Sequence, residues 1–167
     1  DVEVVLPATH DTGSAVAGTP LEDGWAYLSS GTWSLLGVEL GAPCITKESE
    51  EGNFTNEGGV FGTTRFLKNI TGLWLIESCR REWQNEKVLL PYDDLIARME
   101  SIGKVDGEID PDDPVFINPV SMRSTIDGYL AGRGFSPVIG QAATSRLIFQ
   151  SLAKKYADVV KGIEKVT

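Results

Sequence analysis

Apolar and β-branched positions cluster in three runs near the start of the chain. The runs cover residues 2–9, 25–30 and 33–40, and each predicts a β-strand. The first run is expected to be largely buried. Ser30-Gly31-Thr32 separates the second run from the third, and its glycine supplies the backbone freedom that a hairpin turn needs. We therefore predict a three-stranded antiparallel start to a sheet.

Helical spacing of apolar residues takes over from residue 71 onward. One helix is predicted over 71–83, a shorter one over 93–101, and a long amphipathic one over 141–164. The apolar face of the first helix comprises Leu73, Ile76 and Trp83. The apolar face of the long helix comprises Leu147, Ile148, Leu152, Tyr156, Val159, Val160 and Ile163.

Two stretches lack either periodicity. Repeated glycines predict a glycine-rich loop region over 41–69, and prolines and glycines predict a loop over 103–140. Strands followed by helices are typical of the α/β class, here an open sheet covered by helices. The expected layout is one domain with a β-strand layer over 1–40 and a helical part over 70–167.

Net charge restricts the partners that such a domain can have. The chain has 167 residues and a formal charge of -9, which repels nucleic-acid phosphates and anionic lipid. No run approaches the about 18 apolar residues that cross a bilayer, and no signal segment opens the chain. We expect a cytoplasmic protein that binds neither nucleic acid nor membrane. Regular patterns continue to both ends, so we also expect a piece of a larger domain.

Cysteines and acidic clusters offer no metal motif. Cys44 and Cys79 are far apart and form no CxxC pattern, so reduced thiols are expected. Asp110, Asp112 and Asp113 lack the spacing and the closing glutamate of an EF-hand. A solvated acidic loop and no protein-held metal are predicted.

The segment His10-Asp11-Thr12-Gly13-Ser14 carries the strongest candidate chemistry. It follows a predicted strand, where ligands gather in open α/β sheets. There Asp11 could reach a substrate hydroxyl and act as a general base. It could equally serve only as a helix cap with His10 packed beside it. The letters also match the aspartic-protease signature, but such enzymes need two facing carboxylates and the motif occurs once.

A second candidate is the predicted hairpin Ser29-Ser30-Gly31-Thr32-Trp33. A glycine-centred turn can present amide groups and a hydroxyl to phosphate oxygens without obstruction by side chains. By itself this pattern is common. It gains weight because it follows Asp11 by about 20 residues on the neighbouring strand. One cleft could then hold both a base and a phosphate cradle.

Taken together, several ordered segments resemble the FGGY carbohydrate kinases. They are His10-Asp11-Thr12-x-Ser14-Ala15, Tyr27-Leu28-Ser29-Ser30-Gly31-Thr32-Trp33-Ser34-Leu35, Thr55-Asn56-Glu57-Gly58-Gly59 and Leu67-Lys68-Asn69-Ile70-x-Gly72-Leu73-Trp74-Leu75. The similarity covers essentially the whole chain. It implies the first part of the second domain of such a kinase, with a partial ribonuclease H-like (actin-like ATPase) fold.

The resemblance implies a role for each candidate residue. Asp11 would accept the proton of the sugar hydroxyl, with His10, Thr12 and Asn69 contacting the sugar. Gly31 and Thr32 would approach the nucleotide phosphates. At Glu77 family members can present a glutamine, so its carboxylate would need a bridging metal or water to contact the nucleotide.

The activity that the resemblance implies is phosphoryl transfer from Mg-ATP to the C1 hydroxyl of L-rhamnulose. L-Fuculose and xylulose are the alternative ketoses. The expected cofactors are Mg²⁺ and ATP, the latter as substrate, and the expected partner is an N-terminal domain of the same protein. A ligand-binding module without catalysis is the alternative from another class.

Overall fold

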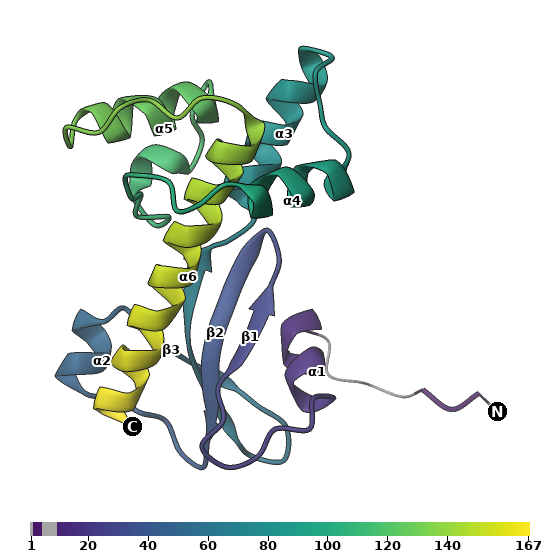
Figure 1. Cartoon of the computed structure of the whole chain (residues 1–167). Helices are drawn as coiled ribbons and strands as arrows, with labels where there is room; N and C mark the ends of the chain where they lie inside the picture. The colour runs from purple at the N-terminus through teal and green to yellow at the C-terminus, as the bar shows by residue number, and fades with distance from the viewer. Residues whose placement is uncertain (1, 5–9) are drawn as a thin grey trace. The chain divides into compact units, whose positions relative to one another are not determined.

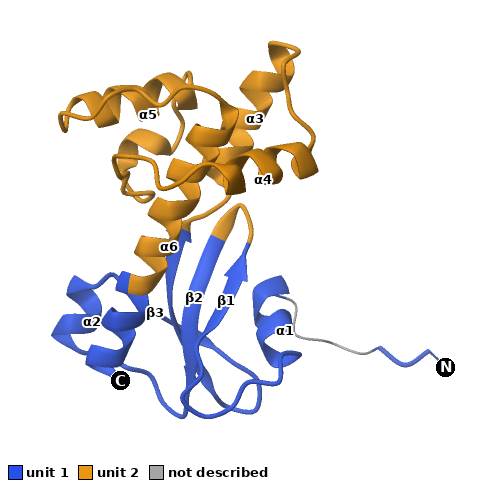
Figure 2. Ribbon diagram, viewed as in Figure 1, with its two compact units in different colours: residues 1–30, 34–70, 158–167 blue, residues 31–33, 71–157 orange. Residues whose placement is uncertain are grey.

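The computed structural model describes residues 2–4 and 10–167 and contains two compact units (Figure 1). Unit 1 comprises residues 1–30, 34–70 and 158–167, and unit 2 comprises residues 31–33 and 71–157 (Figure 2). Each unit has its own buried side chains.

Unit 1 is built on a four-stranded sheet with the order β1-β2-β4-β3. The strands are β1 (Tyr27–Ser30), β2 (Trp33–Leu40), β3 (Thr55–Gly58) and β4 (Thr64–Thr71). β1 pairs antiparallel with β2, and β3 pairs antiparallel with β4.

Strand β4 is covered on both faces. Phe66 and Leu67 are both 0% exposed. Successive side chains on a strand point to opposite faces, so these two residues need two separate covers. Leu67 packs with Val16 of α1 (Asp11–Ala17) and with Tyr27. The ring of Phe66 stacks on Phe54 at a centroid distance of 4.9 Å.

The Phe54 side of the sheet is covered by α2 (Lys47–Glu51) and the last turns of α6 (Gln141–Val166). Figure 1 shows these two helices on the side of the sheet away from α1. Phe54 lies so close to α6 that a Cβ on Gly162 would be 3.0 Å from its Cζ. Thr46 caps α2 by exchanging hydrogen bonds with Ser49.

Unit 2 is helical and contains α3 (Trp74–Asn85), α4 (Tyr92–Ser101), the 3-10 turn η1 (Pro114–Phe116), α5 (Met122–Ala131) and the first part of α6. Its core consists of apolar side chains from these helices and from the loop before η1. They are Leu75, Ile76, Cys79, Trp83, Ile109, Phe116, Met122, Ile126, Leu130, Leu147, Ile148 and Leu152.

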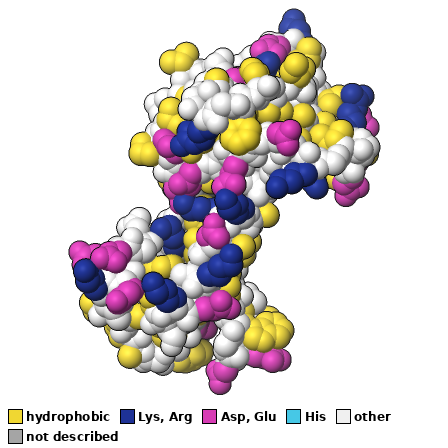
Figure 3. All heavy atoms as spheres, turned by 60° about the vertical axis from the view of Figure 1, so that its left-hand side comes forward, with side chains coloured by type: hydrophobic (Ala, Val, Ile, Leu, Met, Phe, Trp, Pro, Cys, Tyr) yellow, Lys and Arg dark blue, Asp and Glu magenta, His cyan; other side chains and the backbone are white. Residues whose placement is uncertain are grey.

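The surface carries both signs of charge despite the net charge of -9. Figure 3 shows Lys and Arg side chains interspersed with Asp and Glu on the face in view. Ion pairs include Lys154–Glu108 and Lys161–Asp158. Among the described residues, no helix has both the length and the apolar character to cross a bilayer.

The predicted strands are confirmed in part. The runs at 25–30 and 33–40 form β1 and β2. Of the predicted strand at 2–9, residues 2–4 form no strand and Val2 and Val4 are exposed, whereas residues 5–9 lie outside the described residues. The predicted three-stranded start of the sheet is thus confirmed for its hairpin of β1 and β2, and β3 and β4 extend the sheet to four strands among the described residues.

The two predicted loop regions are also wrong in part. Residues 41–69 contain α2, β3 and most of β4, and residues 103–140 contain η1 and α5. The sequence pattern hid β4 because burial on both faces removes the alternation of apolar and polar positions. α5 escaped notice because it is short and carries Gly128 in its interior.

The predicted helices are confirmed with shifted ends. The helix predicted over 71–83 is α3, which begins three residues later, at Trp74, and buries Ile76 and Trp83. The helices predicted over 93–101 and 141–164 are α4 and α6. On α6, five of the seven expected side chains are buried, while Tyr156 and Val160 are half-buried.

Replacing Gly37 on β2 with alanine tests the close approach of β2 and β4. A Cβ at Gly37 would lie 2.5 Å from Leu67 Cβ and 2.5 Å from the Phe66 carbonyl oxygen. Gly37→Ala should therefore lower the free energy of unfolding by about 1–3 kcal/mol, as overpacking does. Gly41→Ala is the matched control, since nothing lies within 4 Å of a Cβ there. Equal denaturation midpoints for the two variants would contradict this packing.

Cys79 should make the stability fall at alkaline pH. Burial, with a smaller effect from the Glu82 carboxylate, raises the pKa of Cys79 from 9.0 to about 12. The unfolded thiol loses its proton first, so this contribution to stability is complete below about pH 9 and is lost as the pH rises toward 12. Urea denaturation across this range should show a smaller pH slope for Cys79→Ala. Cys44→Ala, which changes a half-buried thiol, should keep the parent slope.

Candidate functional site

The segment with Asp11 forms the start of α1 in unit 1. His10 is the N-cap in extended conformation, and its Nδ1 accepts a hydrogen bond from Gly13 N at 3.3 Å. The backbone of Ser14 donates to the His10 carbonyl at 2.8 Å, which closes the first turn. Small residues and a polar cap therefore produce a short helix here, and its N-cap is His10 and not Asp11.

The Asp11 carboxylate is held at one oxygen and open at the other. Oδ1 accepts a hydrogen bond from Thr12 N at 2.7 Å and lies 3.7 Å from His10 Nδ1. Within the described part of the chain, Oδ2 accepts no hydrogen bond. The side chain is 98% exposed. Thr12 is itself buried, and its hydroxyl donates a long hydrogen bond of 3.5 Å to Asp11 Oδ1.

Asn69, expected to contact the sugar, lies on β4, ahead of α3. Residues 65, 67 and 69 alternate with the intervening positions and share one face of the strand. Leu67 on that face packs against α1. Asn69 is exposed, so it presents a polar side chain on the same face of the sheet as Asp11's helix.

Arg65 is the residue near Asp11 that the sequence interpretation missed. Its side chain is 4% exposed and its Nη2 donates to Glu57 Oε2 at 2.8 Å. A Cβ on Gly13 would lie 3.3 Å from Arg65 Nη2, so the guanidinium lies directly against the first turn of α1. The sequence places Arg65 directly before the apolar residues Phe66 and Leu67. Its position on the face toward α1 can be inferred only after residues 64–71 are recognised as a strand.

Gly31 and Thr32 belong to unit 2, where their carbonyl groups hold the start of α3. Gly31 O accepts from Leu73 N at 2.9 Å, and Thr32 O accepts from Gly72 N and Trp74 N at 3.1 and 3.2 Å. α3 has no side-chain cap, so these carbonyls accept the hydrogen bonds of the amides at its N-terminus. The Gly31 amide donates to Trp33 O at 3.0 Å and is therefore occupied, while Thr32 is exposed.

Glu77 lies in the first turn of the same helix. Its Oε1 accepts a hydrogen bond from the Tyr92 hydroxyl at 2.6 Å, and this bond raises the pKa of Tyr92. Tyr92 also stacks under Arg80 at 3.5 Å from the ring centroid. One carboxylate oxygen of Glu77 is thus engaged inside unit 2.

The predicted site residues therefore fall into two groups. His10, Asp11, Thr12 and Asn69 belong to unit 1, on α1 and on the face of β4 that α1 covers. Gly31, Thr32 and Glu77 belong to unit 2, at the hairpin turn and the first turn of α3. Local hydrogen bonds join His10, Asp11 and Thr12 in the first turn of α1, and the carbonyl groups of Gly31 and Thr32 contact the start of the helix that carries Glu77.

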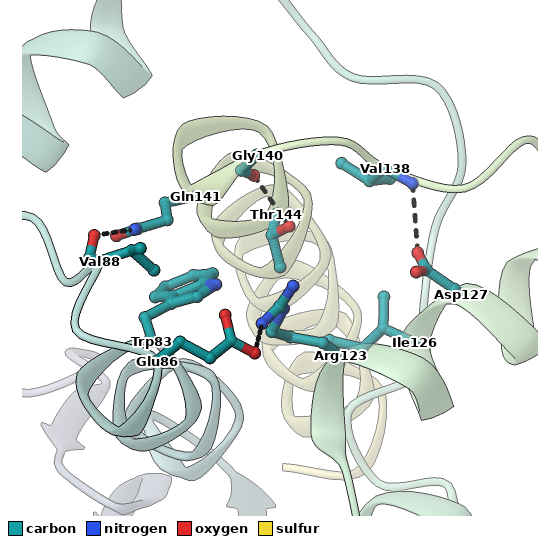
Figure 4. Close-up of a pocket in the computed structure, with 10 residues that line it drawn as sticks. All are labelled: Trp83, Glu86, Val88, Arg123, Ile126, Asp127, Val138, Gly140, Gln141 and Thr144. Carbon is teal, nitrogen blue, oxygen red and sulfur yellow. Dashed lines mark hydrogen bonds and ion pairs between the residues drawn. The ribbon is translucent and has the colours of Figure 1, made fainter.

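A cavity of about 230 Å³ in unit 2 contains none of these residues. It lies between α3, α5 and the start of α6 and has Trp83 in its wall (Figure 4). The polar side chains drawn there are already paired: Arg123 with Glu86 at 2.7 Å, Gln141 with Val88 O at 2.6 Å, and Asp127 with Val138 N at 3.2 Å. A ligand would have to displace these contacts, so the cavity is part of the helix packing.

The acidic loop is organised by a lysine. Lys155 Nζ lies 2.8 Å from Asp110 Oδ1 and 2.9 Å from Asp112 Oδ2. Burial alone would lower the pKa of Lys155, but its hydrogen bonds to Asp110 and Asp112 outweigh burial and raise it. Asp110 is exposed, as predicted for a solvated loop, whereas the Asp112 side chain is only 25% exposed. Across residues 2–4 and 10–167, no group of three His, Cys, Asp or Glu side chains is placed to hold a metal ion.

Comparison with known families decides which kind of domain this is. The profile of the FGGY family of carbohydrate kinases, C-terminal domain, matches residues 26–166. The chain belongs to this family. The FGGY assignment includes the sheet from β1 onward, the hairpin with Gly31 and Thr32, and all of unit 2.

Individual relatives extend the similarity of the FGGY chain to Asp11 and α1. It is 46% identical over 167 residues to the rhamnulokinase of Bacteroides thetaiotaomicron, covering 99% of this chain and 34% of that protein. It is 42% identical over 167 residues to the rhamnulokinase of Halalkalibacterium halodurans, covering 99% of this chain and 35% of that protein. The chain thus spans about a third of the length of the curated relatives it matches.

Proposed function

We propose that the chain is the first part of the second domain of a rhamnulokinase. This enzyme would transfer the γ-phosphoryl group of ATP to the C1 hydroxyl of L-rhamnulose. The observation that carries the proposal is the Asp11 carboxylate, 98% exposed and held at one oxygen. It occurs in a chain that is 46% and 42% identical to two proteins named rhamnulokinase.

The fold supports the finer assignment to a ribonuclease H-like domain. The mixed α/β architecture and the antiparallel pairing of β1 with β2 fit such a domain. The N-terminal domain of the same protein would supply the opposite wall of the cleft and much of the sugar pocket. Residues of that N-terminal domain would determine which ketose binds. L-Fuculose and xylulose therefore remain the alternative substrates.

Asp11 would act through Oδ2. Oδ1 is anchored by Thr12 N, so the carboxylate is oriented while Oδ2 stays open to the sugar hydroxyl. The base accepts the hydroxyl proton as that oxygen attacks the γ-phosphorus in line. General-base help contributes about 10²–10⁴-fold, whereas proximity can supply about 7–11 kcal/mol. Holding the carboxylate and the sugar in place therefore contributes more than the proton transfer does.

Nucleotide binding would use the hairpin turn. Thr32 is exposed at the turn, and its carbonyl fixes the first turn of α3, which carries Glu77. Magnesium, when bound with ATP, would offset charge on the transferring phosphoryl group. Mg²⁺ is commonly held by one or two carboxylates, substrate phosphates and water, so single carboxylates such as Glu77 fit it without a protein-built cluster.

Asp11→Asn in the full-length protein tests the base. We expect kcat with ATP and L-rhamnulose to fall by about 10²–10⁴-fold, because the amide cannot accept the proton. The thermal midpoint should stay at the parent value, since the side chain is exposed. Asp23→Asn, another exposed aspartate of unit 1, is the control and should keep the parent kcat. Parent turnover by Asp11→Asn would leave a non-catalytic ligand-binding module as the better explanation.

The 167-residue chain expressed alone should be inactive. Phosphoryl transfer requires closure of two domains over both substrates, and one domain cannot provide it. A coupled assay with ATP and L-rhamnulose should show no turnover, while circular dichroism confirms that the helices have formed. Turnover near the rate of the full-length protein would contradict the two-domain mechanism.

A further inference from the structure

The helix that carries Asp11 has little to hold it in place by itself. α1 contains only 7 residues, and a helix this short is marginal without tertiary contacts. Asp11 contributes only local hydrogen bonds, to Thr12 and beside His10. The position of Asp11 must therefore be set by what lies under α1.

Contacts at both ends of the helix hold it against the sheet. Val16 packs on Tyr27 and Leu67 near its C-terminal end. The Arg65 guanidinium lies against Gly13 near its N-terminal end, two residues after Asp11. The second contact is the one that bears on the carboxylate, because it lies in the same turn.

The guanidinium is held by residues of the neighbouring strand β3. Arg65 Nη2 donates to Glu57 Oε2 at 2.8 Å, and Nε donates to the Gly58 carbonyl at 3.4 Å. Glu57 is also the direct partner of Arg65 in the antiparallel register of β3 and β4. Two anchored nitrogens leave the planar group with a defined orientation.

This ion pair contributes little to stability by itself. The Arg65 side chain is 4% exposed and the Glu57 side chain 30% exposed, and taking a charged arginine out of water can cost more than its attraction to a partner returns. In addition, Arg65 Nη1 and the Tyr27 hydroxyl are both buried, and within residues 2–4 and 10–167 neither makes a hydrogen bond of good geometry, although the arginine interacts electrostatically with the phenol. Burial raises the pKa of Tyr27 to about 12, so the phenol remains neutral and cannot balance the arginine. Unpaired buried polar groups in a folded protein require an explanation.

We propose that Arg65, anchored by Glu57, is the positioning residue that sets the height and orientation of the Asp11 turn above the sheet. This inference rests on the proposed function of Asp11. Glycine at position 13 is part of the arrangement, because only hydrogen fits comfortably where a Cβ would lie 3.3 Å from Nη2 and 3.4 Å from Cζ.

The proposal also explains the segment Thr55-Asn56-Glu57-Gly58-Gly59, for which the sequence suggested no role. Asn56 exchanges hydrogen bonds with the backbone of Cys44, which fixes β3 to the preceding loop. Glu57 and the Gly58 carbonyl then hold Arg65. The segment thus acts on Asp11 through Arg65, from the strand that neighbours β4.

The test compares kcat and KM in the full-length protein with ATP and L-rhamnulose. We expect Arg65→Met to lower kcat by about 10²-fold, the loss associated with a misplacement of about 1 Å, with little change in the KM for ATP. Arg65→Lys, which keeps the charge but not the planar fork, should fall between Arg65→Met and the parent. Glu57→Gln and Gly13→Ala are milder variants that should lower kcat in the same way while preserving the fold.

Combination with Asp11→Asn separates positioning from general damage. If Arg65 acts through Asp11, Arg65→Met should cause no further loss of kcat in the Asp11→Asn background. The control is Arg123→Gln, which breaks an ion pair of 2.7 Å in unit 2 and should keep the parent kcat.

Each outcome has a defined meaning. Parent turnover by Asp11→Asn refutes the proposed function whatever Arg65 does. Loss of turnover in Asp11→Asn with parent kcat in Arg65→Met, or in both milder variants should Arg65→Met not fold, overturns the positioning role alone. An equal loss from Arg65→Met with and without Asp11 also overturns it, because the residue would then be merely structural.

Discussion

Burial of β4 on both faces is the constraint on which the organisation of unit 1 depends. Phe66 and Leu67 are adjacent and fully buried, so one strand needs two covering layers. α1 provides the first layer, and Phe54 with the end of α6 provides the second. The short helix with the candidate base is therefore part of the core packing, although the Asp11 carboxylate is exposed to solvent.

The sequence predicted those parts of the fold that have a regular period or a local cap. β2 and α6 were predicted because their alternation and their helical stripe are visible in the sequence itself. The segment His10–Ser14 was noticed because small and polar residues follow an apolar run, although the sequence did not identify His10 as the cap. β4 was not predicted, since an element buried on both faces loses the alternation that identifies a half-buried strand.

The candidate site could also be predicted only in part from the sequence. Asp11 has a recognisable neighbourhood in the sequence, whereas Arg65 lies 54 positions away and reaches α1 only through strand pairing. Local patterns contain no information about such a contact. The engagement of Glu77 by Tyr92 is likewise a product of the packing of α3 and α4, which the letters around Glu77 do not reveal.

The carbonyl groups of Gly31 and Thr32 take the place of a capping side chain for α3. The first amides of that helix consequently depend on the backbone of a strand turn that is distant in sequence. Any ligand that shifts the turn would loosen or tighten the opening of the helix. The rates of amide hydrogen exchange at residues 72–74 should therefore change when the conformation of the turn changes.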